Sequence, residues 1–191
     1  VLTFRSMRQR LAAVGLVCVI VASVVTGAQS PSAAPTKSSI KNPVTVRGKY
    51  LSLVVGSNAT TVAPGAQVTL LVEVTPRPRM HLYAPGQAGY IPVNLSVAEN
   101  PAFTTKAPVY PASTPYTFAP TAEAVKVYAG QFMIRADLVV ASSAALKSRA
   151  AKGDTLSVAG AFEYQACDDA VCYRPEKLPV EWKLGLTGKK E

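Results

Sequence analysis

The chain has 191 residues and a formal net charge of +9, with 20 Lys and Arg residues against 11 Asp and Glu residues. This length is enough for one domain with a substantial hydrophobic core. Beyond residues 1–28 the basic residues are spread thinly, without a cluster, and this pattern argues against a protein that binds nucleic acid.

The N-terminal segment has the pattern of an export signal. Three arginines within 5–10 precede an almost wholly apolar stretch at 11–25, and small residues follow it. We therefore predict that residues 1–28 are a signal peptide, cleaved after Ala28. The apolar stretch is shorter than the ~20 residues that span a membrane, and an uncleaved anchor is the alternative interpretation.

An exported protein works in an oxidising compartment, predicted here to be the bacterial periplasm. Cys18 lies in the predicted signal peptide and is removed with it, which leaves Cys167 and Cys172. Residues 29–42 are rich in Pro, Ser, Ala and Lys and are predicted to be a flexible leader. After cleavage we expect a monomer without a membrane span.

From position 43 onward, apolar residues alternate in short runs that predict an all-β domain. Proline and glycine interrupt these runs too often for long helices. The stretch 142–152 has a helix-friendly composition, and we expect one or two helical turns that end at Gly153. The predicted strands are 44–55, 67–75, 93–97, 131–140, 154–165 and 178–184.

Short strands separated by turns at this spacing are typical of an antiparallel sandwich of two sheets. We therefore predict an immunoglobulin-like β-sandwich at residues 43–186, followed by a short tail at 187–191. Cys167 and Cys172 are too close in the sequence to join distant strands across the two sheets. We expect them to face each other across a local hairpin at an edge or tip, with the loop 168–171 between them.

Two cysteines this close can form a redox-active pair or a structural cross-link. Thiol–disulfide exchange needs an accessible sulfur and a second thiol that resolves the mixed disulfide, and a hairpin pair meets both needs. Asp168 and Asp169 disfavour a thiolate at the sulfur beside them. Arg174 and Lys177 favour a thiolate at Cys172, so we predict that Cys172 exchanges first. A structural disulfide in so small a loop would contribute about 2 kcal/mol, and spacing alone does not distinguish the two roles.

Several segments resemble a known family. The run at 164–175 (YQACDDAVCYRP), ahead of the strand-like segment 178–182, resembles the N-terminal periplasmic domain of the thiol:disulfide interchange protein DsbD. The segment 80–86 (MHLYAPG) resembles the aromatic segment beside that family's active cysteines, and 127–130 (VYAG) resembles its cap loop. The similarity extends over about 44–184.

The resemblance implies a role for the cysteines and for nearby aromatic residues. Family members are immunoglobulin-like domains that pass electrons from a membrane-embedded thiol reductase to periplasmic thioredoxin-like and disulfide isomerase proteins, with a link to cytochrome c biogenesis. Cys167 and Cys172 match the redox pair. Tyr83 matches an aromatic residue of the active-site surround, Tyr128 lies near the shielding aromatic of the cap, and His81 belongs to the same surround.

Two other interpretations remain open. The first is a non-catalytic periplasmic binding module in which the hairpin disulfide is structural. The second is a copper-handling protein that uses Met80, His81, Met133 and the reduced cysteines, because soft sulfur and imidazole ligands suit Cu(I). A Ser or Cys hydrolase is disfavoured because the only histidine, His81, has no nucleophile motif beside it. For the preferred redox interpretation we predict no metal and no cofactor.

Overall fold

The computed structural model describes residues 40–118 and 122–188. The predicted signal peptide (1–28) and nearly all of the predicted leader (29–42) lie outside these residues, and the first strand begins at Lys41. Within the described residues, no helix is long and apolar enough to cross a membrane.

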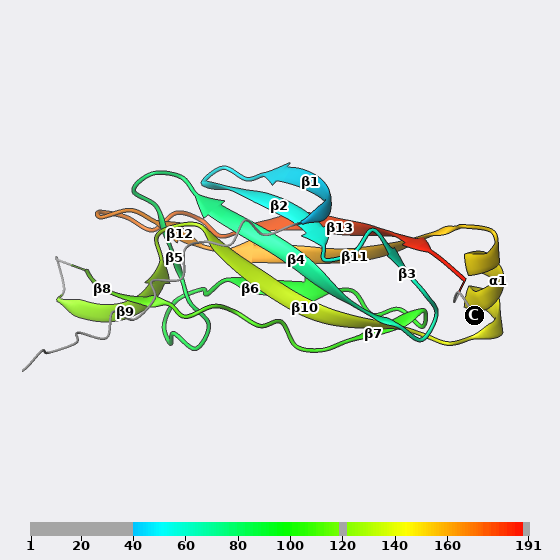
Figure 1. Cartoon of the computed structure of the whole chain (residues 1–191). Coiled ribbons are helices and arrows are strands. Elements are labelled where there is room, and N and C mark those ends of the chain that lie inside the picture. The colour runs from blue at the N-terminus through cyan, green and yellow to red at the C-terminus, as the bar shows by residue number, and fades with distance from the viewer. Residues whose placement is uncertain (1–39, 119–121, 189–191) are drawn as a thin grey trace, which may run out of the picture. The chain divides into compact units, whose positions relative to one another are not determined.

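Two sheets form the body of the domain (Figure 1). In the described part of the chain, the first sheet contains, in spatial order, β1 (Lys41–Arg47), β2 (Leu51–Ser57), β4 (Gln67–Pro76), β10 (Phe132–Val140) and β7 (Phe103–Thr105). The second contains β3 (Thr61–Val62), β13 (Glu176–Leu186), β11 (Thr155–Tyr164) and β6 (Asn94–Val97). Neighbouring strands are antiparallel except β3 and β13.

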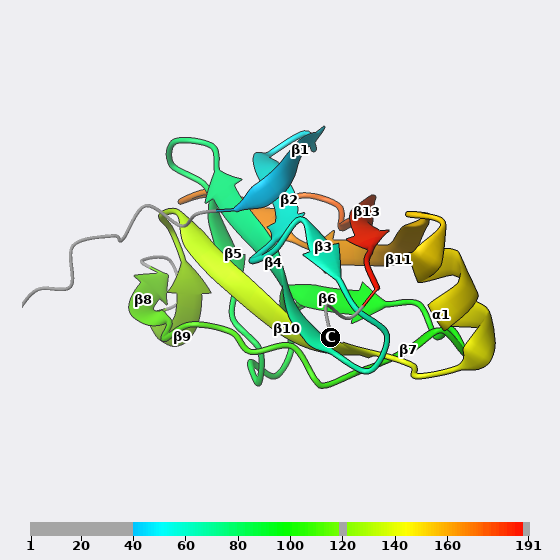
Figure 2. The same cartoon turned by 45° about the vertical axis from the view of Figure 1, so that its right-hand side comes forward.

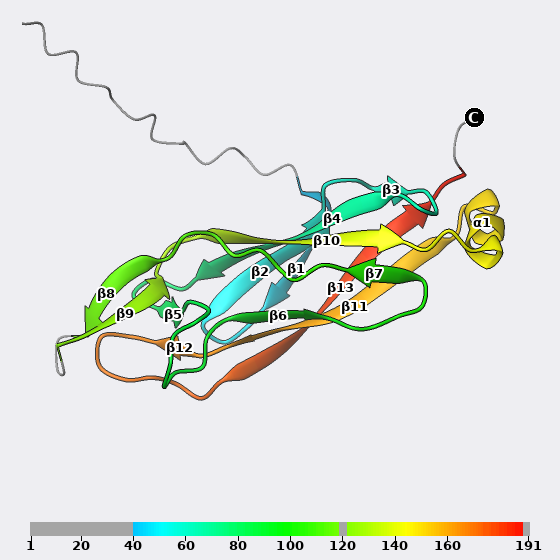
Figure 3. The ribbon, with the colours of Figure 1, turned by 90° about the horizontal axis from the view of Figure 1, so that it is seen from below.

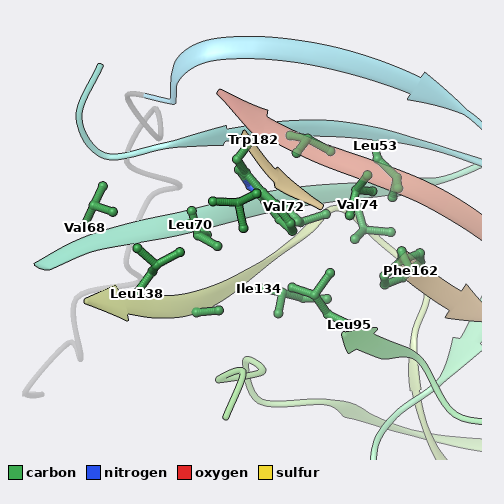
Figure 4. Packing of buried hydrophobic residues seen from close by; sticks show 14 of the residues in the cluster. Leu53, Val68, Leu70, Val72, Val74, Leu95, Ile134, Leu138, Phe162 and Trp182 are labelled. Atoms are coloured by element: carbon green, nitrogen blue, oxygen red, sulfur yellow. The ribbon is translucent and has the colours of Figure 1, made fainter. Parts of the chain in front are cut away.

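The two sheets bury their alternating apolar faces together. Leu70 and Val72 on β4 lie in one cluster with Phe162 and Trp182 from the second sheet (Figure 4). Burial of such side chains is the main favourable contribution to folding. The indole N–H of Trp182 donates to the carbonyl oxygen of Leu71 at 3.3 Å, so its polar atom is satisfied inside the core. The predicted all-β, immunoglobulin-like sandwich is confirmed.

The predicted short helix is confirmed as α1 (Ala144–Ala151). Ser143 caps its N-terminus, because the Ser143 hydroxyl accepts the amide hydrogen of Leu146 at 3.3 Å. Leu146 and Ala150 are buried and fix the helix to the sandwich. Gly153 follows with φ of 69°, a left-handed conformation that commonly ends a helix.

The prediction of one strand over 44–55 is wrong, because the structure has a hairpin of β1 and β2 there. The amide of Gly48 donates to the carbonyl oxygen of Leu51 at 3.0 Å in the turn. A Cβ at Gly48 would lie 2.7 Å from the Tyr164 hydroxyl, so glycine is needed where the turn meets the second sheet. Apolar residues continue on both sides of the turn, which hid it in the sequence pattern. The other predicted strands correspond to β4, β6, β10, β11 and β13.

A third, small sheet forms one end of the domain. Its order is β12 (Ala166–Cys167), β5 (His81–Tyr83), β9 (Glu123–Tyr128) and β8 (Thr114–Phe118). Figures 2 and 3 show it at the end of the sandwich opposite α1. The strand β12, which carries the first cysteine, is an edge strand, in agreement with the expected edge position.

Candidate functional site

Cys167 and Cys172 form a disulfide at the edge of the small sheet. Their sulfur atoms lie 2.07 Å apart and their Cα atoms 4.0 Å apart. Cys167 is the last residue of β12, and the two cysteines form an isolated antiparallel bridge. The structure therefore brings the pair together across a local hairpin, as the sequence predicts.

The two cysteines differ strongly in exposure. Cys167 exposes 1% of its surface, whereas Cys172 is exposed, and its neighbour Val171 is 52% exposed. Disulfide exchange requires a nucleophile to reach one sulfur directly. Cys172 is therefore the cysteine of the pair that solvent and other proteins can reach.

Four aromatic side chains pack beside the disulfide, and we call His81, Tyr83, Tyr90 and Tyr116 the aromatic cluster. Tyr83 stacks on Tyr90 with ring centroids 4.0 Å apart, and His81 packs on Tyr116 at 4.4 Å. Tyr83 and Cys167 share a small buried cluster, against which Tyr90 and Tyr116 pack. The disulfide thus has an apolar aromatic surface on its buried side.

Tyr83 is the member of the aromatic cluster that contacts the exposed sulfur. Its hydroxyl oxygen lies 3.6 Å from Cys172 Sγ, within hydrogen-bond distance for sulfur. Burial raises the pKa of Tyr83 above its ordinary value. The hydroxyl therefore keeps its proton at neutral pH and can donate it in a hydrogen bond to sulfur.

His81 lies opposite the buried cysteine. It pairs with Cys167 where β5 meets β12, and directly opposed residues in such a pair have Cβ atoms roughly 5 Å apart on one face. His81 exposes 4% of its surface. Burial lowers the pKa of His81, although the carboxylates of Asp169 and Asp168 act in the opposite direction. Its ring is therefore neutral at neutral pH.

The β8–β9 hairpin is connected to the cysteine loop by an exposed hydrogen bond, and further polar contacts lie around it. The Tyr116 hydroxyl on β8 donates to Asp169 Oδ1 at 3.1 Å, and Arg79 Nη2 lies 3.7 Å from Asp169 Oδ2. On the same side, Tyr90 donates to Glu123, and this hydrogen bond, with burial, raises the pKa of Tyr90 to about 12. The residues that make these contacts are not members of the main core cluster.

Asp168 organises the loop between the cysteines. Its Oδ1 accepts the amide hydrogens of Ala170 and Val171, each at 2.8 Å, and its Oδ2 accepts the hydroxyl of Tyr173 at 2.7 Å. These bonds, led by that from Val171, lower the pKa of Asp168 to about 2. From the sequence, Asp168 was only a charge beside Cys167. Its place directly after the first cysteine of a short loop is a signal for this role, because Asp there accepts nearby amide hydrogens.

Tyr128, the expected shield, lies in the main core instead. It stacks on Phe132 with ring centroids 4.1 Å apart, and its hydroxyl donates to the carbonyl oxygen of Pro111 at 2.9 Å. Side chains alternate along a strand. Val127 faces the small cluster that contains Cys167, so Tyr128 faces the opposite side. The structure does not bring Tyr128 into the aromatic cluster, and it corrects that prediction.

Sequence reasoning missed Tyr90 and Tyr116. Tyr116 joins the site because β8 pairs with β9, with Tyr116 opposite Val125. The alternating Val125 and Val127 are the signal that could have indicated a half-buried strand here, and the Thr- and Tyr-containing segment before them has the composition of a partner strand. Tyr90 lies outside the strands and carried no comparable signal.

The described residues give no support to the copper interpretation. Among them, no group of three or more His, Cys, Asp and Glu side chains is arranged to hold a metal. Met80 packs against the main core, whereas His81 packs in the aromatic cluster. Met133 lies on β10, in register with Glu73.

A comparison with known families decides the classification. Residues 52–181 match the family described as the N-terminal domain of the thiol:disulfide interchange protein DsbD. This chain belongs to the DsbD N-terminal family. The resemblance found in the sequence is thereby confirmed, and the matched region contains the disulfide, the aromatic cluster and Asp168.

Other comparisons add less to the DsbD N-terminal assignment. The N-terminal periplasmic domain of ScsB from Proteus mirabilis aligns with this chain at a TM-score of 0.47 and 12% sequence identity. The alignment covers 73% of this chain and 49% of that chain, so this chain spans about half the length of that structure. No curated protein matches the chain.

Proposed function

We propose that this DsbD N-terminal domain is an exported thiol–disulfide exchange module. The observation that carries the proposal is the unequal exposure of the cysteine pair, with Cys172 exposed and Cys167 buried. An exposed sulfur accepts attack by a partner thiolate, and a buried sulfur close by resolves the mixed disulfide. We assign the exchanging role to Cys172 and the resolving role to Cys167.

Reduction of the domain takes two steps. A partner thiolate attacks Cys172 Sγ, the bond between the two cysteines breaks, and its electron pair leaves with Cys167 Sγ, which takes up a proton. The partner's second thiolate then attacks the partner's first sulfur, which is bonded to Cys172 in the mixed disulfide. This attack releases the Cys172 thiolate, which takes up a proton. The partner becomes a disulfide and the domain a dithiol, and the reverse steps reduce a downstream disulfide.

The aromatic cluster supplies polar groups to both sulfurs. The Tyr83 hydroxyl, 3.6 Å from Cys172 Sγ, is placed to stabilise a thiolate there. Burial disfavours a thiolate at Cys167. We propose that His81, opposite Cys167 in the strand pair, supplies the N–H of its neutral ring to that sulfur.

We propose that the β8–β9 hairpin, rather than Tyr128, narrows the approach of a thiolate to the disulfide while Cys172 itself stays exposed. Tyr116 on this hairpin packs on His81 and is held to the cysteine loop by its hydrogen bond to Asp169. A partner that competes for Asp169 releases the hairpin, whereas a non-cognate thiol must approach Cys172 with the hairpin in place. Restricted access of this kind gives selectivity against wrong partners.

We propose that the domain works as a monomer in the periplasm, without a cofactor. The export signal predicted at 1–28 supports this location. The first strand of the domain begins at Lys41, two residues before the predicted start of the domain at 43. The family description, thiol:disulfide interchange, supports the exchange itself. Following the sequence resemblance, we propose that electrons flow from a membrane-embedded thiol reductase to periplasmic thioredoxin-like or disulfide isomerase proteins.

Cysteine trapping tests the proposed function. Cys167→Ser is expected to capture a mixed disulfide through Cys172 when it is mixed with a purified periplasmic thioredoxin-like protein, because the resolving sulfur is gone. Cys172→Ser is the matched control and is expected to capture little. Equal capture by both variants contradicts the assignment of the two sulfurs.

The reduction potential of the wild-type protein tests exchange against a structural disulfide. Structural disulfides of secreted proteins have potentials below about −300 mV, and exchange-active disulfides have higher ones. We expect a potential above that limit. A value far below it favours the non-catalytic binding module.

A further inference from the structure

The loop that joins the two cysteines is closed by hydrogen bonds that do not involve sulfur. The amide of Asp168 donates to the carbonyl oxygen of Val171 at 3.0 Å, and the amide of Tyr173 donates to the carbonyl oxygen of Ala166 at 2.8 Å. The side-chain amide of Gln165 donates to the Tyr173 carbonyl oxygen at 3.0 Å. These bonds flank the disulfide, and none of them requires the S–S bond.

The carboxylate of Asp168 binds the chain on both sides of Cys172. Its Oδ1 accepts the amide of Val171, directly before Cys172, at 2.8 Å, together with that of Ala170. Its Oδ2 accepts the hydroxyl of Tyr173, directly after Cys172, at 2.7 Å. Hydrogen bonds to a charged acceptor are stronger than those between neutral groups. Cys172 is therefore held between two residues that bind one carboxylate.

Tyr173 fixes this arrangement to the first sheet of the sandwich. Its ring stacks on Tyr50 with centroids 4.3 Å apart, and Lys49 Nζ lies 5.2 Å from the centre of the Tyr50 ring. Tyr50 belongs to the β1–β2 turn, and its carbonyl oxygen accepts the amide of Arg77 at 2.8 Å. The chain after Cys172 thus rests on the framework of the domain as well as on the disulfide.

We propose that Asp168 is a positioning residue that keeps Cys172 beside Cys167 while the S–S bond is open. This inference rests on the proposed exchange function. Two thiols held in place have a high effective concentration toward each other. The internal disulfide is then favoured over the dithiol, and Cys167 resolves a mixed disulfide quickly.

Exchange with glutathione reports this role. A glutathione thiolate attacks Cys172 Sγ, forms a mixed disulfide and displaces the Cys167 thiolate. Attack by Cys167 on Cys172 Sγ expels the glutathione thiolate and restores the internal disulfide. In competition, a second glutathione thiolate attacks the glutathione sulfur, which frees Cys172 and forms oxidised glutathione. A loosened loop slows only the internal attack.

Redox titration of the purified protein with glutathione measures the effect. Asp168→Ala is expected to lower the equilibrium constant for internal disulfide formation about tenfold, which corresponds to a rise of about 30 mV in reduction potential. The variant is also expected to accumulate the glutathione adduct of Cys172, detected by mass spectrometry. Asp168→Asn keeps an oxygen for the amides of Ala170 and Val171 and is expected to recover most of the equilibrium constant.

Asp169→Ala is the matched control for charge. It removes the same charge one position along the loop, but the Asp169 carboxylate contacts Tyr116 and Arg79 instead of loop amides. We expect a much smaller shift in reduction potential from this change. An unchanged potential in Asp168→Ala, or an equal shift in Asp169→Ala, overturns the positioning role.

The wild-type protein separates this inference from the proposed function. If its disulfide does not exchange with glutathione or with a thioredoxin-like protein, the proposed function fails, and the role of Asp168 fails with it. If the wild type exchanges and Asp168→Ala matches it in potential and adduct level, only the positioning role fails.

Discussion

Replacing Tyr128 with Ala is expected to destabilise the domain without exposing its disulfide. Tyr128 exposes 6% of its surface, stacks on Phe132 and donates a hydrogen bond to Pro111. Truncation of a buried aromatic residue to Ala lowers the free energy of unfolding by about 3–5 kcal/mol. A lost hydrogen bond accounts for about 1 kcal/mol of this. Small domains have unfolding free energies of about 5–15 kcal/mol. The variant is therefore expected to stay folded at a temperature of 25 °C, or at a slightly lower assay temperature.

Two assays on the same variants test this expectation. Urea unfolding followed by the fluorescence of Trp182 gives the change in unfolding free energy. The rate of reduction by dithiothreitol, measured on folded protein, reports how accessible the disulfide is. Tyr128→Phe keeps the stack on Phe132 but removes the hydroxyl, and its free energy of unfolding is expected to fall by about 1 kcal/mol. Both variants are expected to be reduced at the wild-type rate.

Tyr116→Ala is expected to have the opposite effects to Tyr128→Ala on stability and on the rate of reduction. Tyr116 is half-buried at the edge of the aromatic cluster, and its hydroxyl makes an exposed bond to Asp169. Its removal is expected to speed reduction several-fold and to change the unfolding free energy by about 1 kcal/mol or less. Faster reduction of Tyr128→Ala with unchanged stability, and no effect of Tyr116→Ala, would refute our placement of the shield on the β8–β9 hairpin.

Three further predictions concern His81, Tyr83 and Gly48. Burial lowers the pKa of His81 in the folded state, so the unfolded chain binds more protons near and below its pKa of about 6.5. This contribution to stability is fully present above the unfolded-state pKa and is lost as the pH falls from there through the lower folded-state pKa. Urea unfolding at several pH values should show this slope in the wild type but not in His81→Gln. Tyr83→Phe removes the hydroxyl beside Cys172 and is expected to raise the pKa of that thiol in the reduced domain, as measured by ultraviolet thiolate absorbance. Gly48→Ala places a Cβ against Tyr164 and is expected to cost about 1–3 kcal/mol in urea unfolding, whereas Gly130→Ala meets no atom within 4 Å and serves as the control.

The sequence alone was enough to predict the fold class and the cysteine pair. The alternation along β4 and β10 is a local property of the chain, and each strand with a buried face must show it. The four residues between Cys167 and Cys172 restrict the pair to a local hairpin. The short helix also followed from local signals, since its prediction used only the composition of 142–152 and the glycine at 153.

The tertiary structure decided which side chains surround the disulfide. Periodicity shows that Val127 and Tyr128 point to opposite faces of one strand, but it does not show what covers each face. The pairing of β5 with β9 sets Tyr83 opposite Val127 and Leu82 opposite Tyr128. This register joins segments far apart in the sequence, and it places the Tyr128 side chain in the main core.

The exposure of the two sulfurs was likewise decided by long-range packing. Cys167 is buried because β12 pairs with β5 and lies against the aromatic cluster, while Cys172 lies on the outgoing side of the loop, where no strand covers it in the described part of the chain. Local charges favoured Cys172 as the exchanging sulfur. Its exposure depends on contacts with strands that are distant in the sequence, and such contacts leave no periodic pattern around the cysteines themselves.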